Sequence, residues 1–250
     1  IVGVGEAEEG VEAVQAGVPG AQIIFNGPHK TRADLQTAFQ QKVRVHIDHL
    51  DELALAEQVA EELGVVPEVG IRVNLSDIPV PAWDRFGFNL EGGRALEAAR
   101  RLARGRKLEL RALHCHIGTF ILDPDAYRLA ARGIARLANQ LDRELGIRID
   151  TVDLGGGFAS YNTLLGQYLP GEEVTPSLGQ YVERLAAGFD EGFDGAQVPR
   201  VMLETGRALV DDAAILVSTV VGTKRGGEGR RGVMGAAGGT GLPPAGWSGP

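Results

Sequence analysis

Short apolar runs alternate with longer amphipathic stretches along most of this 250-residue chain, and this alternation limits the possible folds more than any other feature. Runs typical of strands span residues 1–4, 21–26, 43–47, 68–74, 108–116, 149–154 and 200–204. Apolar residues at helical spacing predict helices over 6–16, 31–41, 51–63, 91–104, 124–145 and 177–193. Seven strands that alternate with helices predict βα units and a parallel sheet.

Two architectures fit such a pattern, a doubly wound open sheet and a closed (β/α)8 barrel. The seven strands are one short of a closed barrel, and the chain opens inside a strand. We therefore expect a TIM-type barrel over residues 1–210 that lacks its first strand. A further strand-like run at 213–221 and a glycine-rich tail predict that residues 211–250 are the start of a C-terminal β domain with a poorly ordered end.

Composition narrows the possible partners and the cellular setting. The single cysteine, Cys115, excludes a disulfide framework, and the net charge of −8 argues against nucleic acid as a partner. No apolar run approaches the roughly 20 residues that a membrane span needs, and no charged-then-apolar leader opens the chain. We expect a cytoplasmic protein with neither nucleic-acid nor membrane partners.

The residues most suited to chemistry follow three of the predicted strands. In a parallel barrel, functional groups gather where strands end. His114 and His116 end the run at 108–116, the glycines at 155–157 follow the next run, and Glu204 and Arg207 follow the last. This shared position is stronger support for a site than any one of the motifs.

Each motif by itself allows more than one interpretation. His114 and His116 share one face of a strand, so they fit a metal pair completed by Glu204 or Asp153, a structural pair, or a contact to an organic cofactor. Three successive glycines fit a phosphate-binding loop or a tight turn. Glu204 and Arg207 fit a local ion pair, or recognition of a phosphate by the arginine and of a protonated ring nitrogen by the carboxylate.

The three motifs together, in this order, resemble those of the pyridoxal-phosphate-dependent decarboxylases with an alanine-racemase-like barrel. His114-Cys115-His116-Ile117-Gly118-Thr119 is similar to the H-x-H-I-G-S motif of the diaminopimelate branch. The segment 153–158 (DLGGGF) resembles the glycine loop of that branch, and 204–207 (ETGR) resembles its E-P-G-R. Thr119 stands where serine is usual, Phe120 where glutamine is usual, and Thr205 where proline is usual.

The resemblance implies pyridoxal 5'-phosphate as cofactor, a role for each matching residue, and decarboxylation of a small amino acid similar to diaminopimelate, giving lysine. His116 would stack on the pyridine ring, and Glu204 would bind the ring nitrogen and keep it protonated. The phosphate would be held by Thr119, Gly155, Gly156, Gly157, Gly206 and Arg207. The family also implies a homodimer, and we expect no metal.

The lysine that forms the Schiff base in this family is the main departure. The family carries it at the end of the first barrel strand, in a Y-A-x-K-A setting, and none of Lys30, Lys42, Lys107 and Lys224 stands in one. We expect that lysine to precede Ile1, the chain to be incomplete at both ends, and the chain to be inactive alone. The alternatives are a non-catalytic relative that acts as a binding or regulatory protein, and a barrel metal hydrolase that uses His114 and His116.

Overall fold

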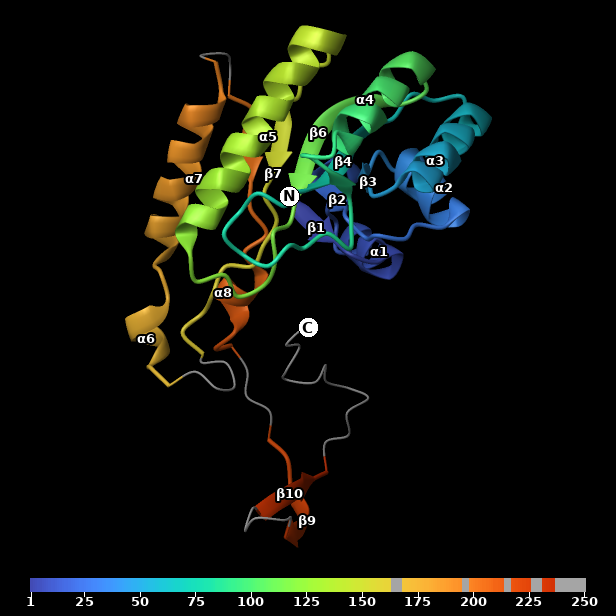
Figure 1. Ribbon diagram of the computed structural model, residues 1–250. Coiled ribbons are helices and arrows are strands. Elements are labelled where there is room, and N and C mark those ends of the chain that lie inside the picture. The colour runs from blue at the N-terminus through green and yellow to red at the C-terminus, as the bar shows by residue number, and fades with distance from the viewer. Residues whose placement is uncertain (163–167, 195–197, 214–216, 226–230, 237–250) are drawn as a thin grey trace. The chain divides into compact units, whose positions relative to one another are not determined.

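The computed structural model describes residues 1–162, 168–194, 198–213, 217–225 and 231–236 (Figure 1). The chain divides into two compact units, residues 1–159 with 176–206, and residues 160–175 with 207–250. The domain boundary expected after residue 210 stays a prediction.

The first unit is built on a parallel sheet whose seven main strands follow one another in chain order. The strands are β1 (Val2–Val4), β2 (Ile23–Phe25), β3 (Arg44–Ile47), β4 (Glu68–Asn74), β6 (Glu109–Cys115), β7 (Thr151–Asp153) and β8 (Arg200–Met202). All seven predicted strands are confirmed, and a short strand, β5 (Phe88–Asn89), that the sequence pattern did not indicate pairs with β4. A doubly wound sheet reverses its strand order at a switch point, so the unbroken order rules that architecture out.

The predicted helices are present between the strands as α1 (Ala7–Gln15), α2 (Arg32–Gln40), α3 (Leu50–Leu63), α4 (Arg94–Gly105), α5 (Pro124–Leu145) and α7 (Leu178–Gly192). Local signals set their ends. Thr31 caps α2 and forms a capping box with Asp34, and Gly146 ends α5 in the left-handed conformation. The helix expected from residue 91 begins only at Arg94, because Gly93 adopts a left-handed φ of 74°.

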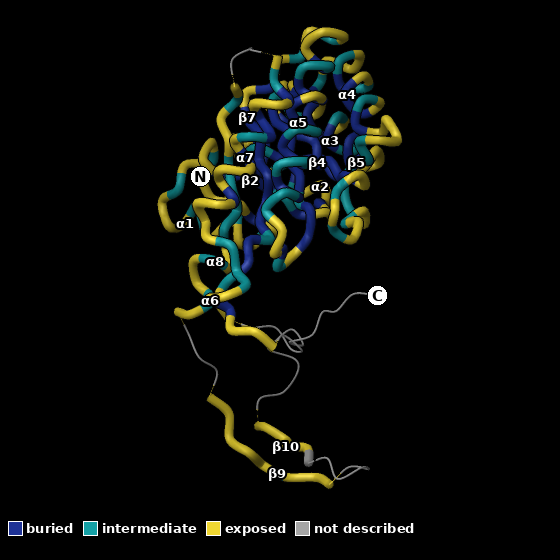
Figure 2. Tube along the Cα trace, turned by 60° about the vertical axis from the view of Figure 1, so that its left-hand side comes forward, coloured by how far each residue is buried: buried dark blue, intermediate teal, exposed yellow. Residues whose placement is uncertain are grey.

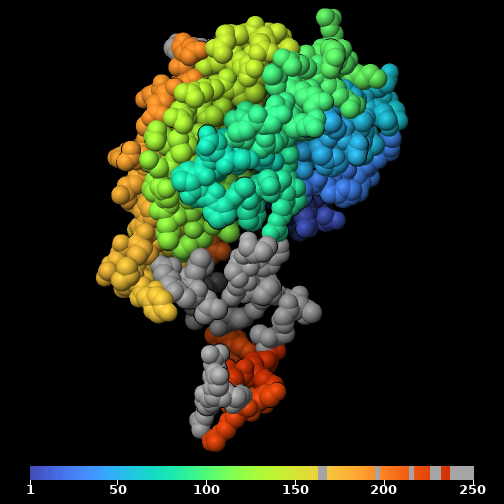
Figure 3. Space-filling view, viewed as in Figure 1, coloured from blue at the N-terminus to red at the C-terminus, as the bar shows by residue number. Residues whose placement is uncertain are grey.

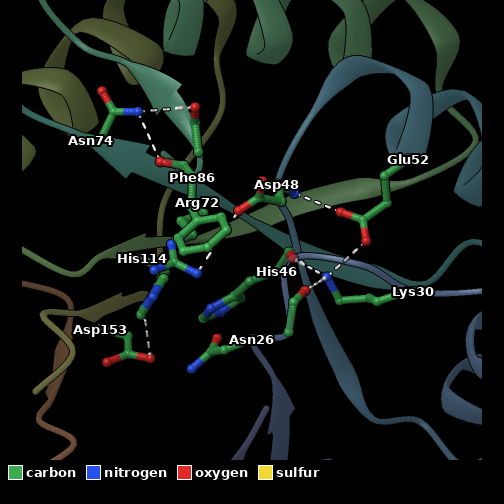
Figure 4. Close-up of polar contacts among 12 residues, drawn as sticks. Asn26, Lys30, His46, Asp48, Glu52, Arg72, Asn74, Phe86, His114 and Asp153 are labelled. Carbon is green, nitrogen blue, oxygen red and sulfur yellow. Dashed lines mark hydrogen bonds and ion pairs between the residues drawn. The ribbon is translucent and has the colours of Figure 1, made fainter. Parts of the chain in front are cut away.

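The two faces of the sheet differ in polarity. Val45 and Ile47 alternate in β3 with His46, and in β4 Ile71 and Val73 alternate with Arg72. All six are buried, and Figure 2 shows the buried trace concentrated along the strands of this unit. Polar side chains therefore share one face of the sheet, where His46, Arg72, His114 and Asp153 lie close together (Figure 4).

The sheet curls until its two outer strands approach each other. Glu204 follows β8, yet a Cβ on Gly3 of β1 would lie 2.8 Å from Glu204 Oε1. Within the described residues β1 and β8 do not pair through their backbones. This curvature and the unbroken parallel order confirm the barrel-type architecture.

The second unit contains α6 (Gly171–Val174), most of α8 (Gly206–Val210), and an antiparallel pair of strands, β9 (Val220–Arg225) and β10 (Arg231–Gly235). Within the described residues, the strand predicted at 213–221 is confirmed only over Val220 and Val221. Ala213 N–H donates to Val210 O in a turn after α8, and the strand begins only at Val220. Residues 214–216 of that run and 237–250 of the glycine-rich tail lie outside the described residues.

Candidate cofactor site at the strand ends

The fold brings together the chemical groups that follow β6, β7 and β8. Gly156 N–H donates to Nδ1 of His116 at 3.2 Å, which joins the segments after β6 and β7. Glu204 N–H donates to Gly155 O at 2.8 Å, which joins the segments after β7 and β8. Five of the eight predicted site residues, His116, Glu204 and the three glycines, therefore lie together at the strand ends.

The three glycines are required by how closely neighbouring segments approach. A Cβ on Gly156 would lie 2.5 Å from Glu204 O, and one on Gly157 would lie 2.3 Å from Gly118 O. Gly155 and Gly157 also have φ values of 61° and 94°, which side chains rarely adopt. Since Gly155 N–H donates to Asp153 and Gly156 N–H to His116, only the Gly157 N–H of the three has no recorded partner among the described residues.

Tyr127 fixes the glycine loop from behind, a role that the sequence analysis missed. Its hydroxyl donates to Gly156 O at 2.8 Å, and its ring stacks on Phe158 with centroids 4.7 Å apart. Tyr127 is fully buried in α5, where its spacing is that of an ordinary core residue. Only the hydroxyl could have signalled this role, because a buried hydroxyl needs a partner.

Glu204 sits in surroundings that disfavour its ionised form. Burial and the neighbouring Asp153 carboxylate raise the pKa of Glu204 to about 8, against the opposing effects of Arg72 and Asn26. The amide of Asn26, at the end of β2, donates to Glu204 Oε1, and its own Oδ1 is buried without a partner. Asn26 is a second site residue that the sequence analysis did not single out.

His116 is held as a neutral ring. Burial, together with the nearby His114 and Arg72, lowers its pKa to about 4. The edge of Trp83 packs against it, with ring centroids 6.1 Å apart, and the Arg85 guanidinium lies 5.7 Å from the Trp83 ring. Figure 3 shows the segment between β4 and β5, which carries Trp83, across the front of the first unit. The sequence suggested no role for Trp83.

Below these groups, the polar face of the sheet carries a cluster of His46, His114 and Asp153. Their ligand-type atoms lie within 4.8 Å of one another, and all three residues are buried. His116 does not belong to this group, so the metal-hydrolase interpretation, which paired His114 with His116, loses its pair among the described residues. Burial raises the pKa of Cys115 to about 12, which agrees with a small packing residue rather than a nucleophile.

Three predicted phosphate contacts are less defined by the structure. Thr119 and Gly206 are exposed, and no atom lies within 4 Å of a Cβ built on Gly206. Arg207 belongs to the second unit, where its guanidinium contacts Asp211 at 3.4 Å. Their roles stay predictions.

Lys30 is placed where it cannot act as a free amine. Its ammonium group donates to Gly27 O at 2.5 Å, to His46 O at 2.8 Å and to Glu52 Oε1 at 2.9 Å, and its side chain has no exposed surface (Figure 4). Burial lowers the pKa of Lys30, although Glu52 opposes the change. Lys30 is a structural residue.

A curled parallel sheet whose strand ends combine a glycine cradle, a neutral histidine and a buried carboxyl defines a class of pyridoxal-binding barrels. Residues 4–211 match the family model for the pyridoxal binding domain of pyridoxal-dependent decarboxylases, so the chain belongs to that family. Its relatives include the diaminopimelate decarboxylase of Actinosynnema pretiosum subsp. auranticum, 36% identical over 222 residues, which are 86% of this chain and 48% of that protein.

Two further relatives show the breadth of the family. The biosynthetic arginine decarboxylase of Alkalilimnicola ehrlichii is 32% identical over 81% of this chain and 34% of its own length. The crystal structure of diaminopimelate decarboxylase from M. jannaschi is 25% identical with a TM-score of 0.76, and the match covers 95% of this chain and 55% of that one. The chain thus spans about half the length of the diaminopimelate decarboxylases that it matches.

Among the described residues, no helix is both long enough and apolar enough to cross a membrane.

Proposed function

We propose that this chain is the cofactor-binding part of a pyridoxal-phosphate-dependent decarboxylase that acts on a diaminopimelate-like amino acid and releases lysine. The observation that carries the proposal is the Glu204 carboxyl, half-buried at the strand ends with its pKa raised to about 8, beside the neutral ring of His116 and the glycine cradle. The family assignment and the similarity to diaminopimelate decarboxylases support the substrate class.

The residues present fit pyridoxal phosphate. The ring of His116 offers a flat, uncharged surface, and Glu204 offers a carboxyl that can share a proton with the ring nitrogen. The Gly157 N–H and the hydroxyl of Thr119, which follows Gly118 in the sequence, offer donors for a phosphate. When bound, the protonated pyridine ring would accept the electrons that remain when an amino acid loses CO2.

We propose that none of the four lysines attaches the cofactor. Lys30 is enclosed, and Lys107 pairs with Glu61. Lys42 lies just before the start of β3, and Lys224 lies in the second unit. These placements support a lysine supplied by sequence outside the residues 1–250, and they predict that the chain alone releases no CO2 from amino acids.

The cofactor site is tested by titrating the chain with pyridoxamine phosphate and, in parallel, with pyridoxamine. We expect saturable binding of the phosphate ester at least about tenfold tighter than that of pyridoxamine, since the phosphate contacts the loop. Equal binding of the two compounds would contradict a phosphate role for the loop. Absence of binding would overturn the cofactor proposal and favour a non-catalytic relative that binds a partner.

The activity is tested on the coding sequence that surrounds these 250 residues. We expect the upstream reading frame to encode a strand that ends in a lysine, and the longer protein to release CO2 from meso-diaminopimelate faster than from arginine or ornithine. A stop codon directly upstream, or faster release from arginine, would contradict the assignment.

Two properties of the longer protein follow from the family resemblance and belong to the same proposal. We propose that it is a cytoplasmic homodimer with no nucleic-acid or membrane partner. Light scattering on the purified longer protein should give twice the monomer mass, and a monomer mass at all concentrations would contradict this.

A further inference from the structure

Asp153 contacts two parts of the candidate site with its two carboxylate oxygens. Oδ1 accepts the Gly155 N–H at 3.0 Å, at the start of the glycine loop. Oδ2 lies 3.1 Å from Nδ1 of His114, in the next strand (Figure 4). Asp153 is completely buried, and so is its partner apart from 1% of its surface. A carboxylate in such a place needs a reason, because burying a charge is costly unless it is compensated.

Asp153 also influences Glu204 through the same glycine. Glu204 N–H donates to Gly155 O, so both acidic residues are hydrogen-bonded to the backbone of Gly155. Two buried carboxyls near each other do not both ionise readily, and one of them keeps its proton. His114 decides which of the two carboxyls keeps the proton. Burial raises the pKa of Asp153, but the electrostatic effect of His114, whose Nδ1 lies 3.1 Å away, outweighs burial, so Asp153 ionises and Glu204 keeps the proton.

The groups that face the carboxyls of Asp153 and Glu204 come from β2, β3, β4 and β6. His46 of β3 lies against His114 with ring centroids 5.1 Å apart, and burial holds its pKa well below the usual range, so it adds no charge. Arg72 of β4 is the one permanent cation of the group, and it acts on both Asp153 and Glu204. Asn26, after β2, donates to Glu204 from the other side. The arrangement leaves a single proton on Glu204.

We propose that Asp153, with His114 as its partner, is a positioning residue that keeps one proton shared between Glu204 and the ring nitrogen of the bound cofactor and that holds the glycine loop in register. This inference rests on the proposed function, because it concerns the same cofactor site. A fixed negative charge beside Glu204 and the ring nitrogen disfavours their deprotonated state, which is negatively charged, relative to the neutral state that shares one proton. Without the Asp153 charge, Glu204 and the ring nitrogen lose the shared proton at a lower pH.

The test uses pyridoxamine phosphate, which carries no aldehyde and so cannot react with lysines. Its ring absorbance is followed against pH while it is bound to the wild-type chain and to Asp153→Asn, and the 31P shift of its phosphate is recorded. In Asp153→Asn the bound ring should lose its proton at a pH lower by about one unit, a tenfold change in the proton equilibrium. The 31P shift should move as well, because Gly155 is held less firmly.

Asp150→Asn is the matched control. Asp150 precedes β7 at the opposite end of the strand, where it pairs with Arg44 at 3.2 Å on a partly exposed surface. The Asp150→Asn variant should leave both the ring titration and the 31P shift unchanged. Asp153→Glu, which restores the charge, should recover part of the ring signal, whereas a residue that only fills space would not be rescued by charge.

The outcomes separate the two proposals. If the wild-type chain does not bind pyridoxamine phosphate, the proposed function fails. If it binds and Asp153→Asn titrates like the wild type, only the positioning role of Asp153 is overturned. If Asp153→Asn does not fold, His114→Asn is used instead. We expect the same direction of shift there, since Asp153 then loses the group that keeps it ionised, and an unchanged titration would overturn the inference.

Discussion

Two buried polar clusters in the first unit differ in how completely their groups are paired. In the Lys30 cluster, formed by Lys30, Glu52 and the carbonyls of Gly27 and His46, all three ammonium protons have acceptors, and the second oxygen of Glu52 accepts the Asp48 N–H at 2.6 Å. In the Asp153 cluster, formed by Asn26, His46, His114, Asp153 and Glu204, buried atoms of four residues have no hydrogen-bond partner.

This difference indicates which cluster is structural and which is functional. Buried polar groups are nearly always paired, so unpaired ones call for an explanation such as a missing water, ion or ligand. The Lys30 cluster is complete within the chain and holds β2, β3 and α3 together. The Asp153 cluster lies beneath the strand ends, where a bound group with a shareable proton would meet the Glu204 carboxyl.

The largest effect is expected from breaking the complete cluster. Lys30→Met leaves the buried Glu52 carboxylate without its cation, and it should lower the free energy of unfolding by about 3–5 kcal/mol. Urea denaturation measures the loss. Lys107→Met is the matched control, because Lys107 also pairs with a glutamate, Glu61, but at the surface. It should cost no more than about 1 kcal/mol. Equal losses would contradict the special status of the Lys30 cluster.

A somewhat smaller effect is expected from filling the glycine cradle. In Gly157→Ala the new Cβ meets Gly118 O at a built distance of 2.3 Å, and φ is 94°. Overpacking and the unfavourable φ together should cost about 2–4 kcal/mol and weaken pyridoxamine phosphate binding. Gly146→Ala has a similar positive φ of 65° but no atom within 4 Å, so it isolates the backbone cost, about 1 kcal/mol. If both variants unfold at the same urea concentration, the close contact is unimportant.

Much of the fold and part of the candidate site could be predicted from the sequence, because they depend on local patterns. Strand runs, the Thr31 capping box and the glycine triplet are all short-range signals, and parallel strands must bring their ends to one edge. That reasoning placed His116, the glycines and Glu204 together. The run at 213–221 has strand-forming residue types as well, but its first residue, Ala213, belongs to the turn that follows α8.

The residues that sequence reasoning missed depend on contacts between distant segments. Asn26 and Glu204 are 178 positions apart, and Tyr127 and Gly156 are 29 apart. An asparagine at a strand end and a tyrosine in a helix core are ordinary in those places, so nothing local marks them. Asp153 was considered only as a possible metal ligand, because its link to His114 depends on the register of β6 and β7.

The Asp153 cluster should also show itself in the dependence of stability on pH. The folded-state pKa of Glu204 is raised to about 8, so folding favours its protonated form. This contribution is complete below the unfolded pKa of about 4.3 and is lost as the pH rises through about 8. Glu204→Gln should therefore reduce the fall in unfolding free energy between pH 5 and pH 9 by about 1–3 kcal/mol. Glu61→Gln, at an exposed carboxyl, should leave the profile as it is; a profile unchanged in Glu204→Gln would contradict the assigned pKa.

The smallest effect is expected where a polar group is removed from the incomplete cluster. Both ring nitrogens of His46 are buried without partners, and its ring packs over Gly70. His46→Leu removes two unsatisfied atoms and loses no side-chain hydrogen bond, since Lys30 bonds the backbone carbonyl of residue 46. The unfolding free energy should change by less than about 1 kcal/mol, in either direction. A loss of about 2 kcal/mol or more would mean that the ring nitrogens bind something in the folded protein. Elemental analysis of the wild-type chain would then distinguish a metal ion held by His46, His114 and Asp153 from a buried water.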